Sequence, residues 1–277
     1  MKSAAFEYSR PGTVAEAVAL LAAADGSAMP ICGGQSLLIL MGLRLTMIDM
    51  LVDVSRLPEL REIRDDGRHV FIGASTTHAA IEDDKIPDPS SGLMSRVASK
   101  IAYRAIRNLG TIGGSMALAD PSADWPACLI ALDAEVSIAG PDGQRWETAQ
   151  NFVSGAYETS LLPAEIVLGF RIARRKSMRW GTSKVSRKSG AFADSMAVFV
   201  EASGDAPPRA ALTGTASHAR ILPRVSKYAQ DRSIPDPGDL RAVILDDLAE
   251  IVPDADAYQL RCHVATVSRA ITEARSS

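Results

Sequence analysis

The chain has 277 residues, a formal net charge of −3 and 47% hydrophobic residues, so it can bury the core of one large domain or of two to three smaller ones. It has neither a basic surplus that would favour nucleic acid or an anionic membrane surface nor an apolar stretch long enough to span a bilayer. The N-terminal residues lack an apolar signal region, and we therefore expect a cytoplasmic protein.

The N-terminal segment predicts a compact β–α–β unit. Thr13 to Glu16 has the sequence of a capping box, and apolar residues then repeat at helical spacing. A strand is expected at 28–31 and leads into a pair of glycines. Ser36 is expected to cap a short apolar helix at 37–41, and a strand at 50–54 follows. The glycine pair therefore lies between a strand and a helix.

The middle of the chain alternates strand and helix patterns up to residue 172. Thr77, with the two polar residues before it, is expected to cap a helix. In chain order the expected elements are a strand at 68–72, helices at 78–83, 93–102 and 124–132, the hairpin strands 135–139 and 144–147, a short helix capped by Thr148, and a strand at 165–172.

Composition changes near residue 173, where a run of basic residues begins. Two strands at 195–201 and 209–213 and two amphipathic helices at 240–251 and 258–274 are expected after it. We therefore place a domain boundary at 173–178. Basic runs of this kind most often form a solvated face, so they indicate no ligand by themselves.

Two glycine-containing segments carry most of the functional information. The first glycine stretch is Cys32-Gly33-Gly34-Gln35-Ser36, and the second glycine stretch is Gly110-Thr111-Ile112-Gly113-Gly114-Ser115. Glycine reaches positive φ cheaply and lets a ligand approach the backbone. A run of backbone N–H groups in such a turn forms a concave anion site, and a helix that begins beyond it adds partial positive charge. Two such sites could together hold the pyrophosphate of a dinucleotide.

Taken alone, each glycine stretch is more often an ordinary turn than a binding site. Neither has the G-x-G-x-x-G spacing, and no G-x-x-x-x-G-K-[ST] sequence occurs in the chain. A dinucleotide bound here would therefore not be held in the manner of a Rossmann fold or a P-loop.

Side chains suited to metal binding or acid–base catalysis are sparse. The three cysteines, Cys32, Cys128 and Cys262, lie far apart and cannot hold an iron–sulfur cluster. We expect free buried thiols, with Cys32 as a small filler beside the first glycine stretch. None of the four histidines has metal-ligand spacing, so we expect neither a metal site nor a catalytic side chain. A cofactor should then carry the chemistry of any enzyme.

Asp120 and Asp124 lie four residues apart, after the second glycine stretch. Paired carboxylates can serve as acid and base. Structural roles compete with this interpretation, namely a turn residue before Pro121 and the N-cap of the helix at 124–132. By pattern alone, we favour the structural roles.

These segments resemble the flavin-binding medium subunit of the molybdenum hydroxylases, the xanthine dehydrogenase and carbon monoxide dehydrogenase group. The resemblance covers nearly the whole chain and begins at Phe6-Glu7-Tyr8-Ser9-Arg10-Pro11. Its most specific parts are Gly33-Gly34-Gln35-Ser36-Leu37-Leu38 and Asn108-Leu109-Gly110-Thr111-Ile112-Gly113-Gly114-Ser115, followed by Asp120-Pro121-Ser122-Ala123-Asp124. The C-terminal part resembles the family more weakly, through Lys184-Val185-Ser186-Arg187 and residues 261–270.

The resemblance implies an α+β fold, with a two-subdomain, PCMH-type FAD-binding domain followed by a small α+β C-terminal domain that has a three-stranded sheet plus helices. The FAD-binding domain is expected at residues 1–175, with subdomains at about 1–56 and 57–175. The C-terminal domain, similar to that of carbon monoxide dehydrogenase flavoproteins, is expected at 176–277.

The resemblance also implies FAD as the cofactor of this chain. Both glycine stretches would grip the pyrophosphate, Asp124 would accept hydrogen bonds from ribityl or ribose hydroxyls, and Lys184 would lie near the flavin ring. Either Ile166 or Val167 would lie near the adenine or the ring end. The full set of implied FAD-binding residues is Cys32, Gly33, Gly34, Gln35, Ser36, Ile101, Thr111, Ile112, Gly113, Gly114, Ser115, Asp124, Ile166, Val167 and Lys184.

The chain departs from the family pattern after Arg187. The family usually continues quickly into an Asp-aromatic-Ala run, whereas here residues 188–193 intervene and Asp194 is followed by Ser195 and Met196. The residue that covers the second face of the flavin is therefore left open.

The resemblance implies an oxidoreductase, in which this chain is the FAD-carrying electron-transfer subunit of a heteromeric enzyme. A large partner subunit would hold the molybdenum cofactor and a small one two [2Fe–2S] clusters, in a dimer of heterotrimers. Electrons would leave FAD for NAD, oxygen or a quinone, while the substrate stays open. A stand-alone FAD oxidase or dehydrogenase is one alternative, although the region after 173 is small for a substrate domain. A flavin-free scaffold is another, and the intact glycine stretches count against it.

Overall fold

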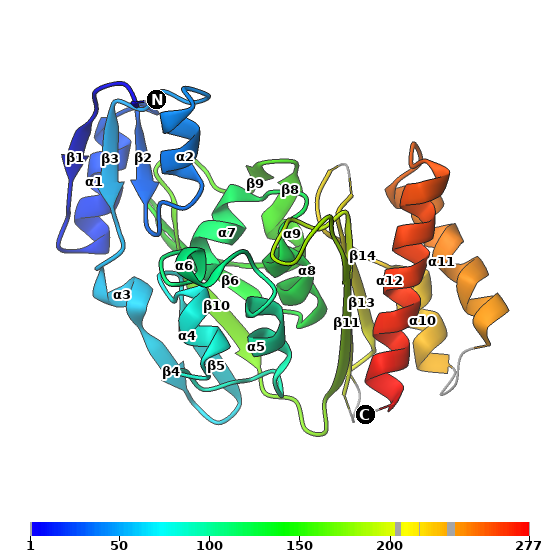
Figure 1. Cartoon of the computed structure of the whole chain (residues 1–277). Coiled ribbons are helices and arrows are strands. Elements are labelled where there is room, and N and C mark those ends of the chain that lie inside the picture. Colours follow the sequence, from blue (N-terminus) through cyan, green and yellow to red (C-terminus); the bar gives the residue numbers. More distant parts are fainter. Residues whose placement is uncertain (1, 203–205, 216, 232–235, 277) are drawn as a thin grey trace.

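The computed structural model describes residues 2–202, 206–215, 217–231 and 236–276. Three main sheets, of three, five and four strands, follow one another along the chain, and helices pack around them (Figure 1). This arrangement confirms the mixed α+β fold class. The domain boundaries near 56 and 175 stay a prediction.

The N-terminal sheet has three parallel strands in the order β1-β3-β2, with β1 at Glu7–Ser9, β2 at Ala28–Ile31 and β3 at Met50–Asp53. The helices of this part are α1 (Val14–Ala23) and α2 (Leu37–Gly42).

The two predicted helix caps of the N-terminal part are only partly confirmed. Thr13 caps α1 by accepting from the Glu16 N–H at 3.2 Å, but the Glu16 side chain accepts from Gly12 instead of Thr13, so the capping box is half formed. The prediction that Ser36 caps α2 was wrong, because Ser36 has near-helical backbone angles and makes no side-chain cap bond.

Tyr8 and Arg10 attach the edge strand β1 to the middle strand β3. The Tyr8 hydroxyl and the Arg10 guanidinium both donate to the Asp53 carboxylate, and the two Arg10 bonds measure 3.0 and 3.1 Å. The family-like sequence at residues 6–11 therefore has a structural function. It fixes the sheet from which the first glycine stretch emerges.

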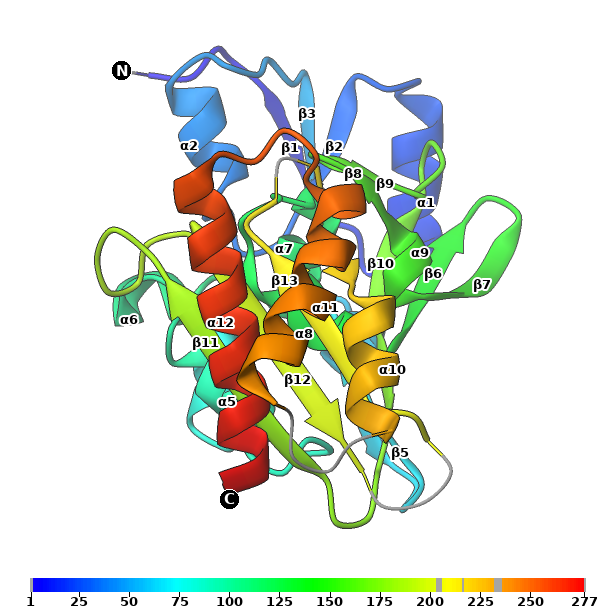
Figure 2. The same cartoon turned by 90° about the vertical axis from the view of Figure 1, so that its right-hand side faces the viewer.

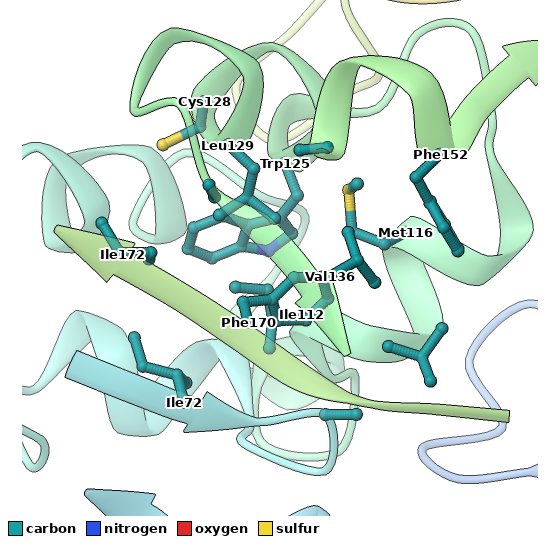
Figure 3. Packing of buried hydrophobic residues seen from close by; sticks show 14 of the residues in the cluster. Ile72, Ile112, Met116, Trp125, Cys128, Leu129, Val136, Phe152, Phe170 and Ile172 are labelled. Carbon is teal, nitrogen blue, oxygen red and sulfur yellow. The ribbon is translucent and has the colours of Figure 1, made fainter. Parts of the chain in front are cut away.

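The central sheet has the strand order β4-β5-β10-β6-β7, and each neighbouring pair is antiparallel. Its strands are β4 (Ile63–Asp65), β5 (His69–Gly73), β6 (Glu135–Gly140), β7 (Gly143–Thr148) and β10 (Ile166–Ala173), which confirms the predicted strands of this region. The helices α7 (Ile112–Leu118) and α8 (Asp124–Ala131) contribute to the main core, in which Trp125, Phe152 and Phe170 are fully buried (Figure 3).

Short elements make the remaining connections: α3 (Pro58–Arg61), α4 (His78–Glu82), α5 (Leu93–Ala98), α6 (Arg104–Arg107), α9 (Ala149–Phe152), and the paired strands β8 (Val153–Gly155) and β9 (Glu158–Thr159). Thr77 and Thr148 cap α4 and α9 as predicted. The helix predicted at 93–102 ends at Ala98, and the chain then turns through Ala102, which has a φ of 43°, into α6.

The C-terminal sheet has four antiparallel strands, β11 (Arg179–Val185), β12 (Ser195–Glu201), β13 (Arg209–Thr213) and β14 (Arg220–Ile221), where three were expected. The additional strand β14 has two residues, too few for a sequence pattern. The helices α10 (Pro223–Asp231), α11 (Pro237–Ile251) and α12 (Ala257–Ser276) cover one face of this sheet, and α8 packs on the other (Figures 1 and 2). Within the described ranges, no helix combines the length and the apolar character needed to cross a bilayer.

Candidate functional site

The two glycine stretches lie in direct contact. The first follows the carboxyl end of β2, and the second leads into α7. A Cβ atom placed on Gly33 would lie 2.1 Å from the carbonyl oxygen of Leu109 and 3.0 Å from the Cα of Gly110. Only a residue without a Cβ permits this approach. The fold therefore brings both predicted segments to one place.

The first glycine stretch presents open hydrogen-bond donors. Gly34 has a φ of 67°, in the left-handed region that glycine adopts without strain. Gln35 Nε2 donates to the Gly33 carbonyl at 2.9 Å and fixes the turn. In the described part of the chain, the Gly33 N–H is hydrogen-bonded to the Cys32 thiol, whereas the backbone N–H groups of residues 34–36 donate to no protein acceptor. Consecutive open donors in a turn are the arrangement that an anion site requires.

The second glycine stretch is built differently. α7 begins at Ile112, and the Thr111 hydroxyl caps it by accepting from the Gly114 N–H at 3.1 Å. The Gly113 N–H donates to the Ala74 carbonyl at 3.0 Å, and a Cβ on Gly113 would lie 2.4 Å from the Cβ of Ala74. The prediction of a loop with open N–H groups ahead of the helix was therefore wrong, because Gly113 serves close packing and its N–H is already bonded.

Cys32 lies beside the meeting point of the two glycine stretches. Its Sγ is 3.2 Å from the Ser75 Oγ, and burial raises the pKa of the thiol. A neutral, partly buried thiol is a filler and not a nucleophile, in agreement with the interpretation from the sequence. Ser75 was not among the predicted site residues.

Asp124 and Lys184 form a buried ion pair. The Lys184 Nζ lies 2.7 and 3.0 Å from the two carboxylate oxygens, and the side chains are 12% exposed for Lys184 and 5% for Asp124. Because Lys184 belongs to β11 and Asp124 to the first turn of α8, the pair joins the C-terminal sheet to the helix that follows the second glycine stretch. Burial raises the pKa of the Asp124 carboxyl, and the Lys184 ammonium partly offsets this effect.

Asp124 is not the helix N-cap that its position suggested. Ala123 occupies that position, while the Asp124 carboxylate is bonded to Lys184. Asp120 does have the predicted turn role, since it accepts from the Ser122 N–H at 2.8 Å, and it also accepts from the Tyr157 hydroxyl at 3.1 Å. The two carboxylates thus have separate partners among the described residues and do not form an acid–base pair.

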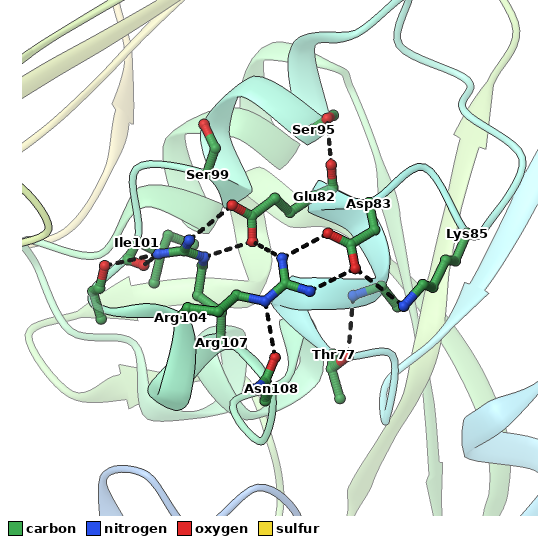
Figure 4. A network of polar contacts seen from close by, with 12 residues as sticks. Thr77, Glu82, Asp83, Lys85, Ser95, Ser99, Ile101, Arg104, Arg107 and Asn108 are labelled. Carbon is green, nitrogen blue, oxygen red and sulfur yellow. Dashed lines mark hydrogen bonds and ion pairs between the residues drawn. The ribbon is translucent and has the colours of Figure 1, made fainter.

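A charge network holds the segment that leads into the second glycine stretch (Figure 4). Arg107 donates twice to Glu82, at 2.7 Å each, and to two main-chain carbonyls at 2.9 Å, one of which belongs to Ile101. Arg104 joins Glu82 to Asp83. The hydrogen bonds from Arg107 lower the pKa of Glu82. The network thus fixes the backbone of Ile101, a predicted FAD-binding residue whose side chain is half-buried.

Ile166 and Val167 are placed in the core, with exposures of 3% and 7%. Their strand β10 is connected to the second glycine stretch through hydrogen bonds to Ala74. The Leu168 carbonyl accepts from the Ala74 N–H at 2.8 Å, and the Ala74 carbonyl accepts from the Gly113 N–H. Contact of Ile166 or Val167 with a ligand stays a prediction.

A cavity of about 380 Å³ lies apart from the glycine stretches. Residues of α9, β14 and α11 line it, among them Gln150, Arg220 and Asp247. None of the predicted FAD-binding residues lines this cavity, so it adds nothing to the candidate cofactor site.

The first glycine stretch fits a cofactor that carries a pyrophosphate, because its open N–H groups and its close backbone approach suit phosphate oxygens. The family described as the FAD binding domain in molybdopterin dehydrogenase matches residues 4–174. This chain belongs to that family. The FAD-binding chain is thus an oxidoreductase subunit, and FAD is its cofactor.

Similarity to known proteins extends over most of this FAD-binding chain. It is 38% identical over 218 residues to the carbon monoxide dehydrogenase medium chain of Hydrogenophaga pseudoflava, covering 78% of this chain and 73% of that one. It is 34% identical over 192 residues to the nicotine 6-hydroxylase medium subunit of Paenarthrobacter nicotinovorans, covering 69% and 67%. A solved structure of the H. pseudoflava carbon monoxide dehydrogenase, in a form that lacks the Mo-pyranopterin moiety of the molybdenum cofactor, matches 100% of this chain and 99% of that chain, with a TM-score of 0.93 and 31% identity. The resemblance to the medium subunits of molybdenum hydroxylases is therefore confirmed.

His78 is a residue of this site that sequence reasoning missed. The Trp125 Nε1–H donates to the His78 Nδ1 at 3.0 Å, and both side chains are buried. Burial, together with the charge of Arg107, lowers the pKa of His78 to about 4, so the imidazole is neutral near pH 7. A histidine at the first position of a short predicted helix gives no signal of this burial or of its distant partner.

We expect His78→Asn to remove part of the acid dependence of stability. The unfolded chain binds a proton at His78 near pH 6.5, but the folded chain binds it only near pH 4. Between these values the unfolded state binds more protons than the folded state. The free energy of unfolding of the wild type therefore decreases as the pH is lowered from about 6.5 to about 4, and His78 accounts for about 3 kcal/mol of this decrease. Urea denaturation of both proteins across this range measures the difference, and parallel curves would contradict a neutral buried imidazole.

Proposed function

We propose that this chain is the FAD-carrying electron-transfer subunit of a heteromeric molybdenum hydroxylase. It receives electrons from the [2Fe–2S] clusters of a partner subunit and delivers them to an external acceptor, which is NAD, oxygen or a quinone. The observation that carries the proposal is the match over the whole chain to a chain of carbon monoxide dehydrogenase. The open N–H groups of the first glycine stretch add a physical basis for holding the cofactor.

Bound FAD supplies the redox chemistry, so the task of this chain is to bind and orient it. Residues 34–36 would donate their backbone N–H groups to the pyrophosphate oxygens, and Gly33 and Gly34 place no side chain in the way. The second glycine stretch contributes differently, because the N–H groups of Ile112 and Gly113 already bond to the chain itself. It would bring Thr111 and its own backbone against the first stretch and so complete the wall of the site.

The Asp124–Lys184 pair would lie toward the flavin, as the family resemblance implies. Each carboxylate oxygen accepts one hydrogen bond from Lys184 and keeps a lone pair for a hydroxyl of the cofactor. The carboxylate in turn keeps the ammonium in place, where it can stabilise negative charge on a reduced ring. The pair therefore combines hydroxyl recognition with charge stabilisation.

The proposed role requires partner subunits. An iron–sulfur cluster needs several thiolates, whereas this chain has three cysteines, of which Cys128 and Cys262 are buried. We propose a large subunit with the molybdenum cofactor and a small subunit with two [2Fe–2S] clusters, assembled as a dimer of heterotrimers in the cytoplasm. The substrate would bind to the large subunit, and relatives named for carbon monoxide and for nicotine have similar medium subunits.

Purification of the tagged full-length chain from its host tests this proposal. We expect one large and one small partner chain, with iron, molybdenum and FAD in the same complex. The isolated chain should contain flavin without iron and should not oxidise the substrate of the complex. A flavoprotein that has no partners and turns over a small molecule by itself would contradict the proposal and favour the stand-alone oxidase.

A further inference from the structure

We propose that His78 is a positioning residue of the FAD site, whose imidazole fixes the second glycine stretch relative to α8. The inference rests on the proposed cofactor site and goes beyond it, because His78 is not among the predicted FAD-binding residues. His78 acts through Gly110 and Trp125, without a contact of its own to the cofactor.

The backbone of His78 is joined to the second glycine stretch. An isolated antiparallel bridge connects Thr77 to Thr111, and next to it the His78 N–H donates to the Gly110 carbonyl at 2.9 Å. Thr77 also caps α4, which begins at His78. The imidazole therefore extends from a backbone position that is fixed on both sides.

The imidazole packs against Gly110. A Cβ on Gly110 would lie 3.0 Å from both Cδ2 and Nε2 of His78, so any larger residue at position 110 would push the ring away from its observed place. The Cα of Gly110 is in turn the atom that a Cβ on Gly33 would approach to 3.0 Å. His78, Gly110 and Gly33 thus form successive layers. A displaced imidazole would move one glycine stretch relative to the other.

α8 fixes the orientation of the imidazole. The Trp125 Nε1–H donates to the His78 Nδ1 at 3.0 Å, and the ring centroids are 6.0 Å apart. Because Nδ1 accepts, the neutral ring carries its proton on Nε2. Trp125 is fully buried (Figure 3) and directly follows Asp124, which pairs with Lys184. One hydrogen bond therefore links the second glycine stretch to the helix that begins with the buried ion pair.

The test measures the FAD affinity of the full-length chain by flavin fluorescence titration. His78→Leu removes the acceptor, Trp125→Phe removes the donor, and His78→Asn keeps an acceptor near the position of Nδ1. We expect the first two variants to raise the FAD Kd about tenfold, and His78→Asn to stay within about threefold of the wild type. The double variant His78→Leu/Trp125→Phe should bind no more weakly than the weaker single variant, because both changes remove the same bond.

His263→Leu is the matched control. His263 is 2% exposed, and its Nδ1, like that of His78, has a buried side-chain hydrogen-bond partner, here the Ser195 hydroxyl at 2.8 Å in the C-terminal part. We expect this change to lower Tm and leave the FAD Kd unchanged. The NMR resonance of the Trp125 indole N–H reports the bond itself. It should shift in His78→Leu and stay near its wild-type position in His78→Asn.

Two results would overturn the inference. One is a wild-type FAD Kd in His78→Leu. The other is a His78→Asn variant that binds FAD as weakly as His78→Leu, since the FAD affinity would then depend on the packing of the ring and not on its hydrogen-bond acceptor. If His78→Leu does not fold, Trp125→Phe and His78→Asn still distinguish these cases. A wild-type chain that binds no FAD would overturn the proposed function as well. If the FAD Kd is unchanged in all of these variants, only the role of His78 is overturned.

Discussion

Gly33→Ala is expected to yield a chain that no longer binds FAD. The new Cβ would lie 2.1 Å from the carbonyl oxygen of Leu109 and 2.9 Å from its carbonyl carbon, so the backbone has to move. The segment that moves carries the open N–H groups of residues 34–36, and it loses its contact with the second glycine stretch. We also expect the free energy of unfolding to fall by about 1–3 kcal/mol, as for other overpacked sites. Flavin absorbance per chain and urea denaturation measure the two effects.

Gly42→Ala is the matched control for Gly33→Ala. Gly42 ends α2, shortly after the first glycine stretch, and a Cβ there meets no atom within 4 Å. We expect it to keep FAD and to change stability by less than about 1 kcal/mol. Gly67→Ala measures the effect of backbone strain alone, because Gly67 has a φ of 80° and a Cβ there meets no atom within 4 Å, so we expect it to keep FAD. Full FAD content in Gly33→Ala would contradict the contact between the two stretches.

Lys184→Met is expected to lower the free energy of unfolding by about 3 kcal/mol at neutral pH, because it leaves the Asp124 carboxylate buried without a counter-ion. Burial already raises the pKa of Asp124, and loss of the ammonium raises it further. The folded variant then takes up a proton at a higher pH than the unfolded chain does. Its stability relative to the wild type should therefore recover as the pH is lowered. Urea denaturation at several pH values measures both the cost and its pH dependence.

Arg179→Gln provides the control for Lys184→Met on the same strand. Arg179 is 49% exposed and pairs with Glu201 at 2.9 Å, so we expect a loss below about 1 kcal/mol. The double variant Asp124→Asn/Lys184→Met should regain part of the lost stability, because an amide needs no counter-ion. A Lys184→Met variant as stable as Arg179→Gln would show that the pair is not a buried charge pair.

Local sequence patterns were sufficient for much of the fold. The strands predicted at 195–201 and 209–213 have the observed bounds, and α8 ends within one residue of its prediction. Thr77 and Thr148 cap the helices expected after them. These features depend on a few neighbouring residues, so periodicity and cap chemistry detect them.

Contacts between distant segments could not be predicted in this way. Lys184 meets Asp124 across 60 residues and Trp125 meets His78 across 47, and neither pair has a spacing that signals the contact. The second glycine stretch was predicted as a loop, but α7 already begins ahead of its two adjacent glycines. Packing against Ala74 decides that arrangement, and Ala74 lies far back in the sequence. These parts of the site are therefore determined by tertiary contacts, which local sequence propensity does not predict.

The flavin content of the isolated full-length chain shows whether the two glycine stretches hold FAD. We expect FAD, released by denaturation and identified by chromatography, at about one molecule per chain, with no iron in the same sample. A chain that is purified without flavin and takes up none when incubated with FAD would rule out cofactor binding by the two glycine stretches, whose contact would then have another reason.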